Sequence, residues 1–230
     1  MKNLAIIPAR SGSKGIRDKN IRDLNGRPLI YYSIAAALES GMFDTVMLST
    51  DSEKYAMIGK NSGAEVPFLR SEKTSSDTAS SWDAVSEVLE KYKEAGKSFD
   101  TFMLLQPTSP LRTADDIRKA YKEFEEKEAE TVISLCETDP PFQCNTLPCD
   151  LSMDSFIKPE AKGKRRQDLE KYYKFNGAIY LTRVAFFEED HNIYRDRCFA
   201  YVMDKLNSID IDDEADFRLA EALLSLKENQ

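Results

Sequence analysis

Short apolar runs alternate with amphipathic stretches over the first 135 residues of the chain. The runs cover residues 4–7, 45–49, 66–69, 102–105 and 131–135. Each run is nearly continuous in its apolar character, which is typical of strands that are buried on both faces of a sheet. With helical patterns between most of these runs, the chain is predicted to be α/β, with a mostly parallel, doubly wound sheet and helices on both faces.

Helix-start signals fit between the predicted strands. Pro28 suits the first turn of a helix that contains LIYYSIAAAL, and Ser52 can cap EKYAMIGKN. Thr113, with Asp116 three residues later, resembles a capping box. These signals support helices in the positions that a doubly wound fold requires.

The pattern breaks after residue 135. Residues 139–166 contain four prolines, scattered aromatic residues and the basic run KGKRR, and residues 172–181 then resemble a returning strand. We therefore expect a single domain over residues 1–230, with 139–175 as a protruding insertion. A long arm on a compact α/β domain is often a dimer contact, and the alternative is a disordered surface loop.

Composition narrows the function classes. The 230 residues carry a net charge of −8 and are 41% hydrophobic, so general nucleic-acid binding is disfavoured. No apolar run is long enough for a signal peptide or a membrane span, and a soluble, cytoplasmic protein is expected. Four cysteines without CxxC spacing and a single histidine, His191, argue against structural zinc, redox chemistry and a Ser-His-Asp mechanism.

The first candidate site is the loop in LAIIPARSGSKGIRDKN, which follows the first predicted strand. Ligands of open α/β sheets bind at the carboxyl ends of strands, and Gly12 and Gly15 would let the backbone approach an anion. The spacing matches neither a P-loop nor a dinucleotide-binding loop. The pattern favours nucleotide phosphate binding over a solvated basic loop, through the cations Arg10, Lys14, Arg17 and Lys19.

The second candidate site is the segment SIDID at residues 208–212. Because strand side chains alternate between faces, Asp210 and Asp212 are predicted to point to the same side. Two adjacent carboxylates with bound phosphates suit Mg²⁺. The alternative is that Asp212 or Asp213 simply caps the helix that follows.

Three further polar segments could line the same site. Gln106, in LLQPTSPLR, would sit at the end of a buried strand, where an amide can bind a sugar hydroxyl. The segment RSEKTSSDTASS places Arg70 where it could bind a base, or it is a surface loop in which Ser80 or Ser81 caps a helix. In the segment RRQDLEKYYKFNGAIY, Arg165 and Arg166 could bind an acidic ligand, although charged runs of this kind are usually solvated.

Taken together, six segments resemble the CMP-acylneuraminate synthetases, also called acylneuraminate cytidylyltransferases, including those for N-acetylneuraminate and legionaminate. The segments occur in order over nearly the whole chain and are IIPARSGSKGIRDKN, LSTDSE, FLRSEKTSSDTASS, LLQPTSPLR, RRQDLEKYYKFNGAIY and SIDIDDEADF. The resemblance implies a Rossmann-like domain with a dimerisation arm, hence a homodimer. It also implies transfer of CMP from CTP to a nonulosonic acid, with Mg²⁺, or Mn²⁺ in its place, as cofactor.

The resemblance also implies roles for individual residues. The nucleotide would contact Arg10, Ser13, Lys14, Asn20, Arg70 and Ser81. The sugar would contact Gln106, Arg166, Tyr173, Asn176 and Tyr180. Arg10, Lys14 and Lys19 would stabilise the departing pyrophosphate, while Asp210 and Asp212 would be catalytic through the metal that they bind.

The acceptor is the part of this assignment that stays open. Glu170 stands where many members of the family carry proline after RQDL, close to the expected sugar site. N-acetylneuraminate is the first expectation, and legionaminate or another nonulosonate is the alternative. A sugar phosphate acceptor, with Arg165 and Arg166 as additional cations, and a nucleotide-binding regulator without catalysis are the competing hypotheses.

Overall fold

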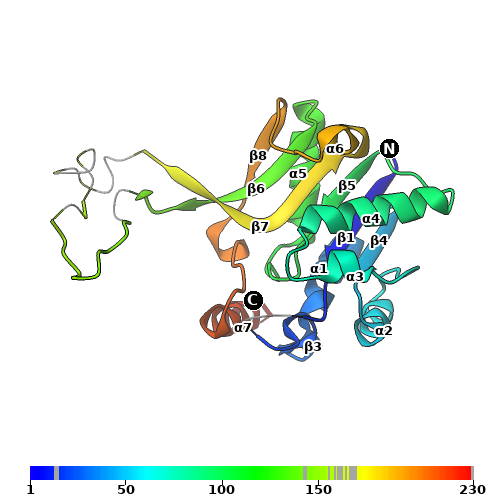
Figure 1. Ribbon diagram of the computed structural model, residues 1–230, viewed down its shortest axis with the longest axis horizontal. Coiled ribbons are helices and arrows are strands. Elements are labelled where there is room, and N and C mark those ends of the chain that lie inside the picture. The colour runs from blue at the N-terminus through cyan, green and yellow to red at the C-terminus, as the bar shows by residue number, and fades with distance from the viewer. Residues whose placement is uncertain are drawn as a thin grey trace.

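A six-stranded sheet forms the centre of the molecule (Figure 1). The computed structural model describes residues 1–12, 16–141, 144–154, 156–157, 159, 163, 165 and 170–228. In spatial order the strands are β4 (Thr45–Ser49), β1 (Asn3–Pro8), β5 (Thr101–Leu104), β7 (Tyr172–Arg183), β6 (Thr131–Thr138) and β8 (Cys198–Val202).

Strand direction confirms a mostly parallel sheet. Strand β1 pairs in parallel with β4 and β5, and β6 pairs in parallel with β8. Strand β7 runs antiparallel to both β5 and β6, between which it lies. The chain therefore returns from the insertion into the middle of the sheet, and the start of β7 lies beside the carboxyl ends of the parallel strands.

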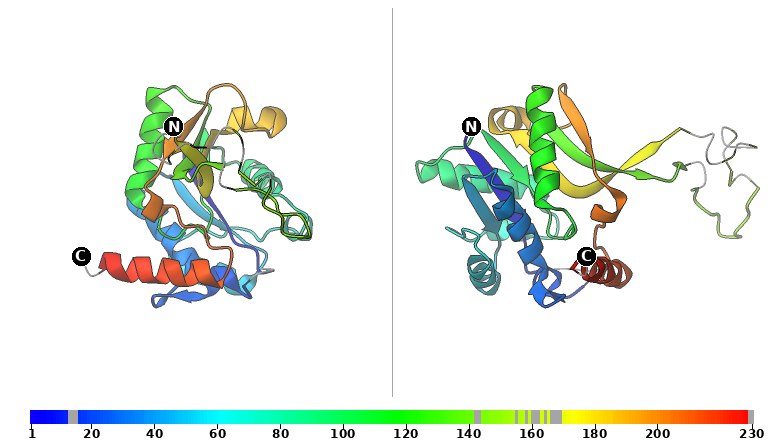
Figure 2. Two further views of the ribbon diagram at one scale, coloured as in Figure 1. Left: turned by 90° about the vertical axis from the view of Figure 1, so that its left-hand side faces the viewer. Right: turned by 180° about the vertical axis from the view of Figure 1, so that it is seen from behind.

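Helices cover both faces of the sheet, as predicted (Figure 2). One apolar core packs α1 and α5 against the sheet, and a second packs α4 and α6 against its other face. The helices are α1 (Leu29–Ser40), α2 (Glu53–Asn61), α3 (Glu72–Ser75), α4 (Ser81–Glu94), α5 (Ala114–Glu126), α6 (Val184–Asp190) and α7 (Glu214–Glu228). The smaller elements are β2 (Asp23–Leu24), β3 (Arg27–Pro28) and two 3-10 turns, Lys19–Ile21 and Lys205–Asn207.

The predicted helix caps are present, with one shift. Ser52 accepts a hydrogen bond from the Tyr55 amide, and Thr113 forms a capping box with Asp116. Pro28 was predicted to lie in the first turn of α1, but it is the N-cap, and the helix begins one residue later at Leu29. The caps therefore set where α2 and α5 begin.

The prediction of a strand at residues 66–69 is wrong. The chain makes a single bridge to the sheet, between Met47 and Glu65, and then runs as a loop. Val66 is buried and Leu69 packs on the core, so the run is apolar because its side chains cover the core, although it forms no strand. This loop delivers Arg70 to the end of β4, where its amide bonds the Thr50 carbonyl at 2.8 Å.

The insertion leaves the sheet as a two-stranded arm. The outer parts of β6 and β7 remain paired from Leu135 and Phe175 to Thr138 and Tyr172, and the arm extends away from the body of the molecule (Figures 1 and 2). Its dimerisation role stays a prediction. Among the residues that the structure describes, no helix has both the length and the apolar character needed to cross a membrane.

Candidate functional site

A cavity of about 450 Å³ opens where β1 and β5 end. The carboxyl ends of parallel strands are where α/β sheets bind ligands, because the loops that follow them converge there. Its lining contains the following sequence-predicted residues: Arg10, Lys19, Asn20, Arg70, Ser81, Gln106 and Asp212. Ser13, Lys14 and Arg166 lie outside the described residues.

Hydrogen bonds anchor the predicted phosphate loop at Ser11 and at Asp18. Ser11 donates hydrogen bonds from its amide and its hydroxyl to the two carboxylate oxygens of Asp51, both at 2.8 Å. On the far side, the Tyr55 hydroxyl donates to Asp18 at 3.0 Å. Sequence reasoning did not identify Asp51 or Tyr55 as anchors, since each lies about forty residues from its partner.

Two side chains hold the phosphate loop in place, one through the aspartate segment and the other within the loop itself. Lys19 donates from Nζ to the Ile211 carbonyl at 2.7 Å, between the two predicted metal-binding aspartates. Buried Asn20 donates from Nδ2 to the Arg10 carbonyl at 3.1 Å. The loop and the aspartate segment therefore form one wall.

Arg10 reaches across the cavity opening. Its guanidinium donates to the Ser76 carbonyl at 3.1 Å and pairs with Asp77 at 2.8 Å. The side chain of Arg10 is 31% exposed, so the ion pair is screened and weak. An anion that enters the cavity would compete with Asp77 for Arg10.

Arg70 is held at the end of β4. Its Nε donates to the Ser49 hydroxyl at 3.2 Å and one terminal nitrogen to the Ser49 carbonyl at 3.4 Å. Burial lowers the pKa of Arg70, and the charges of Asp51 and Glu87 act in the opposite direction. Arginine is charged at neutral pH in proteins, so Arg70 presents a cation to the cavity that it lines.

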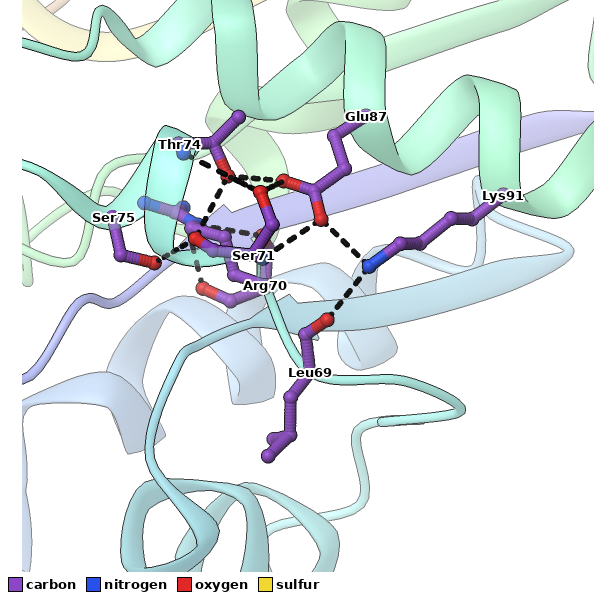
Figure 3. A network of polar contacts seen from close by, with 8 residues as sticks. Leu69, Arg70, Ser71, Thr74, Ser75, Glu87 and Lys91 are labelled. Atoms are coloured by element: carbon purple, nitrogen blue, oxygen red, sulfur yellow. Dashed lines mark hydrogen bonds and ion pairs between the residues drawn. The ribbon is translucent and has the colours of Figure 1, made fainter.

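Glu87, on α4, fixes the turn that follows Arg70 (Figure 3). It accepts from the Ser71 amide at 2.8 Å, from the Ser71 hydroxyl at 3.0 Å and from the Thr74 hydroxyl. Lys91 pairs with it at 2.6 Å and also donates to the Leu69 carbonyl at 2.8 Å. Burial alone would raise the pKa of Glu87, but the bonds from Lys91, Thr74 and Ser71 outweigh it and lower the pKa to about 2.

Glu87→Gln is expected to lower the free energy of unfolding by about 1 to 3 kcal/mol at pH 7, because an amide cannot accept all of these bonds. The pKa of Glu87 lies below its ordinary value of 4.5, so this stabilisation is present above pH 4.5 and is lost as the pH falls toward 2. Urea unfolding at pH 7 and at about pH 2.5 measures both effects, because most of the stabilisation is still present at pH 4. Glu90→Gln, at an exposed position of the same helix, is the control, and equal stabilities of the two variants would contradict the expectation.

The aspartate pair lies between the main cavity and a second one. Asp212 lines both cavities, and Asp210 borders the second, which measures about 320 Å³. Of the two aspartates considered as the cap of α7, Asp213 is the one that caps it: its Oδ1 accepts hydrogen bonds from the amides of Ala215 and Asp216. Asp212 is therefore not the residue that caps α7.

Asp210 has an unusual environment for a carboxylate. Its Oδ1 is buried and has no hydrogen-bond partner. Burial raises the pKa of Asp210; a hydrogen bond from Thr108 opposes the rise and the charge of Asp212 adds to it. An unpaired buried oxygen beside a second carboxylate fits a cation ligand. Within the described part of the chain, no three acidic, histidine or cysteine side chains converge on a metal position, so a cation would also need ligand or water oxygens.

Gly177 lets Gln106 approach Asp210. The backbone of Gly177 has φ +71°, and a Cβ atom there would lie 2.7 Å from Gln106 Oε1 and 3.2 Å from Asp210 Oδ2. From the sequence alone Gly177 was assigned no role, and it appeared only as part of the NGAIY motif. A side chain at this position would push apart two of the residues predicted to serve the acceptor and the metal.

Asn176 directly precedes this glycine, and Tyr180 lies three residues after it. Tyr180 packs edge-on against Trp82 and is not among the described residues that line either cavity. Asn176 is 2% exposed; its Oδ1 accepts from Ser134 at 2.6 Å, and its Nδ2 donates to Ser208 at 2.9 Å. These bonds give Asn176 a positioning role, because direct sugar contact by its amide would require them to break. Burial raises the pKa of Tyr180 to about 12, with Tyr194 and Asp210 adding to the rise.

Tyr173 lies apart from the other predicted sugar ligands. It pairs with Glu137 in the outer part of the arm and is 45% exposed. It is not among the described residues that line the two cavities, and its role stays a prediction. His191 is exposed and stacks on Phe187 with ring centroids 4.8 Å apart.

Comparison with known proteins gives this geometry a context. The family model described as "Cytidylyltransferase" matches residues 4–228. The chain is 38% identical over its full length to the N-acylneuraminate cytidylyltransferase of Escherichia coli O18:K1:H7, of which it covers 54%. It is 36% identical to the CMP-N,N'-diacetyllegionaminic acid synthase of Legionella pneumophila, with 99% of the chain and 98% of that protein covered.

Two further similarities extend the comparison. The pseudaminic acid cytidylyltransferase of Campylobacter jejuni is 36% identical over 97% of the chain and 96% of its own length. The chain therefore spans about half the length of the Escherichia coli relative and nearly the whole of the other two. A solved CMP:2-keto-3-deoxy-manno-octonic acid synthetase complexed with CTP matches with a TM-score of 0.73 at 17% identity, covering 99% of this chain and 100% of the other, which shows a shared fold.

Proposed function

Because the chain belongs to the cytidylyltransferase family, we propose that it transfers CMP from CTP to a nonulosonic acid and releases pyrophosphate. The observation that carries the proposal is one cavity edge where three groups meet. These are the cationic loop with Arg10 and Lys19, the Arg70 turn, and the cluster of Gln106 and Asp210 around Gly177. Such an arrangement suits a triphosphate, a base and a polar acceptor.

On the nucleotide side, each group has a chemical task in the proposal. Arg10 and Lys19 neutralise the phosphates, with Lys14 and Ser13 of the same loop beside them in the sequence. Arg70 and Ser81, which line the same cavity, bind the cytosine ring through its polar edge. Asn20 holds the loop backbone through the Arg10 carbonyl.

On the acceptor side, Gln106 and Tyr180 orient the sugar acid. The oxygen of the anomeric hydroxyl attacks the α-phosphorus in line and its proton is released to solvent, while the bond from that phosphorus to the oxygen bridging to the β-phosphate breaks. The released pyrophosphate carries the negative charge toward Arg10 and Lys19, which stabilise it as it departs. Orientation and fixed charge supply the catalysis in this account.

Asp210 and Asp212 would hold Mg²⁺, or Mn²⁺ in its place. The fit rests on the buried, unpartnered Oδ1 of Asp210 and on the position of Asp212 at both cavities. When bound, the cation would supply charge neutralisation at the phosphates. Hard oxygen ligands of this kind suit either ion.

N-acetylneuraminate is the acceptor that we propose first, with legionaminate as the alternative, since relatives named for each are similarly identical to this chain. The test is pyrophosphate release with CTP, Mg²⁺ and, in turn, N-acetylneuraminate, legionaminate, pseudaminate and 3-deoxy-manno-octulosonate, with UTP and ATP as nucleotide controls. Turnover with CTP and one nonulosonate supports the proposal. CTP binding without turnover on any of the four acceptors would favour the non-catalytic regulator. Turnover on a sugar phosphate, added as a fifth acceptor, and on no other would favour the other competing hypothesis.

We propose further that the arm binds a second copy of the chain. The side chains of Leu147, Leu151 and Met153 are between 50% and 69% exposed. They belong to the segment that protrudes from the body of the molecule (Figure 1). Apolar side chains in such a position are typical of an interface. A cytoplasmic location stays a prediction.

Light scattering is expected to give twice the 26.2 kDa mass of one chain. The double substitution Leu147→Glu with Met153→Glu is expected to yield a monomer, because it places charges in the proposed interface. Leu219→Glu, at an exposed position on α7, is the matched control and should remain dimeric. A monomeric unsubstituted protein would contradict the proposal.

A further inference from the structure

Arg112 is a buried cation that the proposed mechanism does not use. It lies two residues after the second proline of LLQPTSPLR and is 2% exposed. One terminal nitrogen donates to the Ala178 carbonyl at 2.9 Å and to the Gln106 carbonyl at 3.3 Å. The other donates to the Ser33 hydroxyl, on α1, at 2.6 Å. The guanidinium thus ties together three segments that are distant in the sequence.

These contacts leave the charge poorly compensated. Among the described ion pairs Arg112 takes part in none, and its Nε has no hydrogen-bond partner. Burial lowers the pKa of Arg112 to about 10, and the charge of Asp116 opposes this shift. Burying a cation among neutral acceptors is strongly unfavourable, and an apolar side chain would fill the same space without that penalty. Packing alone therefore does not account for an arginine here.

The two carbonyls that Arg112 binds belong to the acceptor side of the site. Gln106 is the residue whose Oε1 packs against Gly177, and Ala178 directly follows Gly177. Ser33 adds a third link, because its hydroxyl also lies 3.3 Å from the Gln106 carbonyl. Arg112 therefore holds the end of β5 and the start of the inner part of β7 at a fixed separation.

We propose that Arg112 is a positioning residue that sets the geometry of the acceptor site by clamping the backbone of Gln106 to that of Ala178. The inference rests on the proposed function, in which Gln106 orients the sugar acid. Arg112 is not among the described residues that line either cavity, so it acts through Gln106 and Gly177 and touches no substrate. Its side-chain hydrogen bonds go to Gln106, Ala178 and Ser33, and none reaches the described residues of the phosphate loop or the Arg70 turn, so nucleotide binding should be insensitive to it.

The test compares Arg112→Met and Arg112→Lys with the unsubstituted protein in steady-state kinetics. Arg112→Met is expected to raise KM for the sugar acid roughly tenfold or more and to leave KM for CTP within about twofold. Arg112→Lys keeps the charge and one of the bonds, so it should recover part of the loss. Arg118→Met, an exposed arginine on α5, is the matched control and should leave both constants unchanged.

A merely structural role would give a different result. It would lower the melting temperature and the fraction of active protein while both KM values stayed unchanged, and that outcome would overturn the inference. If Arg112→Met does not fold, Ser33→Ala removes one of the links without changing a charge. It is expected to raise the sugar KM roughly threefold, and an unchanged sugar KM would also overturn the inference.

Failure of the proposed function would be recognisable separately. If the unsubstituted protein turns over none of the sugars, the kinetic comparison is replaced by amide hydrogen exchange on the free protein. Arg112→Lys is then expected to speed exchange in residues 105–109 and 177–180 at least several-fold more than in residues 70–75. Uniform or unchanged exchange would overturn the role of Arg112 whatever the reaction is.

Discussion

Asp210→Asn is expected to lower kcat by about a hundredfold to a thousandfold while changing the affinity for CTP much less. The substitution removes one negative charge from the proposed cation site and places an amide where Oδ1 has no hydrogen-bond partner. CTP affinity should persist, because Arg10, Lys19 and Arg70 remain in the main cavity. Pyrophosphate release under saturating substrates and equilibrium titration with CTP measure the two quantities.

Asp213→Asn is the matched control for this experiment. It changes a neighbouring carboxylate that caps α7, and asparagine is nearly as good an N-cap as aspartate. Its kcat should stay close to that of the unsubstituted protein. Near-full activity of Asp210→Asn would refute the metal-binding role of Asp210, and equal losses in both variants would point to a general disturbance of the 208–216 segment.

Gly177→Ala is expected to reduce kcat/KM for the sugar acid by at least about a hundredfold, because small displacements of reacting groups have effects of this size. The added methyl group would lie 2.7 Å from Gln106 Oε1 and 3.2 Å from Asp210 Oδ2, so both side chains must move. The positive φ of +71° adds a strain of about 1 kcal/mol. Initial rates at varied sugar concentration measure the loss.

Gly26→Ala separates the two causes. Gly26 has φ +76°, and a methyl group added there would meet no other atom within 4 Å, so the substitution introduces the strain without the collision. It should lower stability slightly and leave kcat/KM nearly unchanged. If Gly177→Ala behaves like Gly26→Ala, the close approach of Gln106 and Asp210 is not important for the reaction.

The sequence predicted the parts of the fold that depend on local pattern. Continuous apolar runs identified β1, β4, β5 and β6, and the aromatic, β-branched run at 172–181 identified β7. The direction of β7 and its place between β5 and β6 were not predicted, because a residue pattern carries no information on strand order. The edge strand β8 was missed even though all five of its residues, CFAYV, are apolar or aromatic, and most of them are exposed.

In the candidate site, too, the features that depend on local pattern were predicted and those that depend on contacts between distant segments were not. Loops at the ends of apolar runs were found because strand ends in α/β sheets converge, and this located Arg10 and Gln106 at one cavity. Asp212 lines the same cavity, but the strand predicted for residues 208–212 is wrong, because this segment is irregular. The anchoring residues Asp51 and Arg112 were missed as such. Their roles come from bonds across 40 and 66 residues of sequence, which only the folded chain brings together.

Phosphorus NMR of the complete reaction tests the central claim most directly. CTP, Mg²⁺ and a nonulosonic acid are incubated with the unsubstituted protein, and the phosphorus signals are followed with time. We predict that the CTP signals disappear while a phosphodiester signal and pyrophosphate grow in equal amounts, because the anomeric oxygen replaces pyrophosphate on the α-phosphorus. Unchanged CTP with every nonulosonic acid, or its hydrolysis to CMP without a phosphodiester product, would contradict the account.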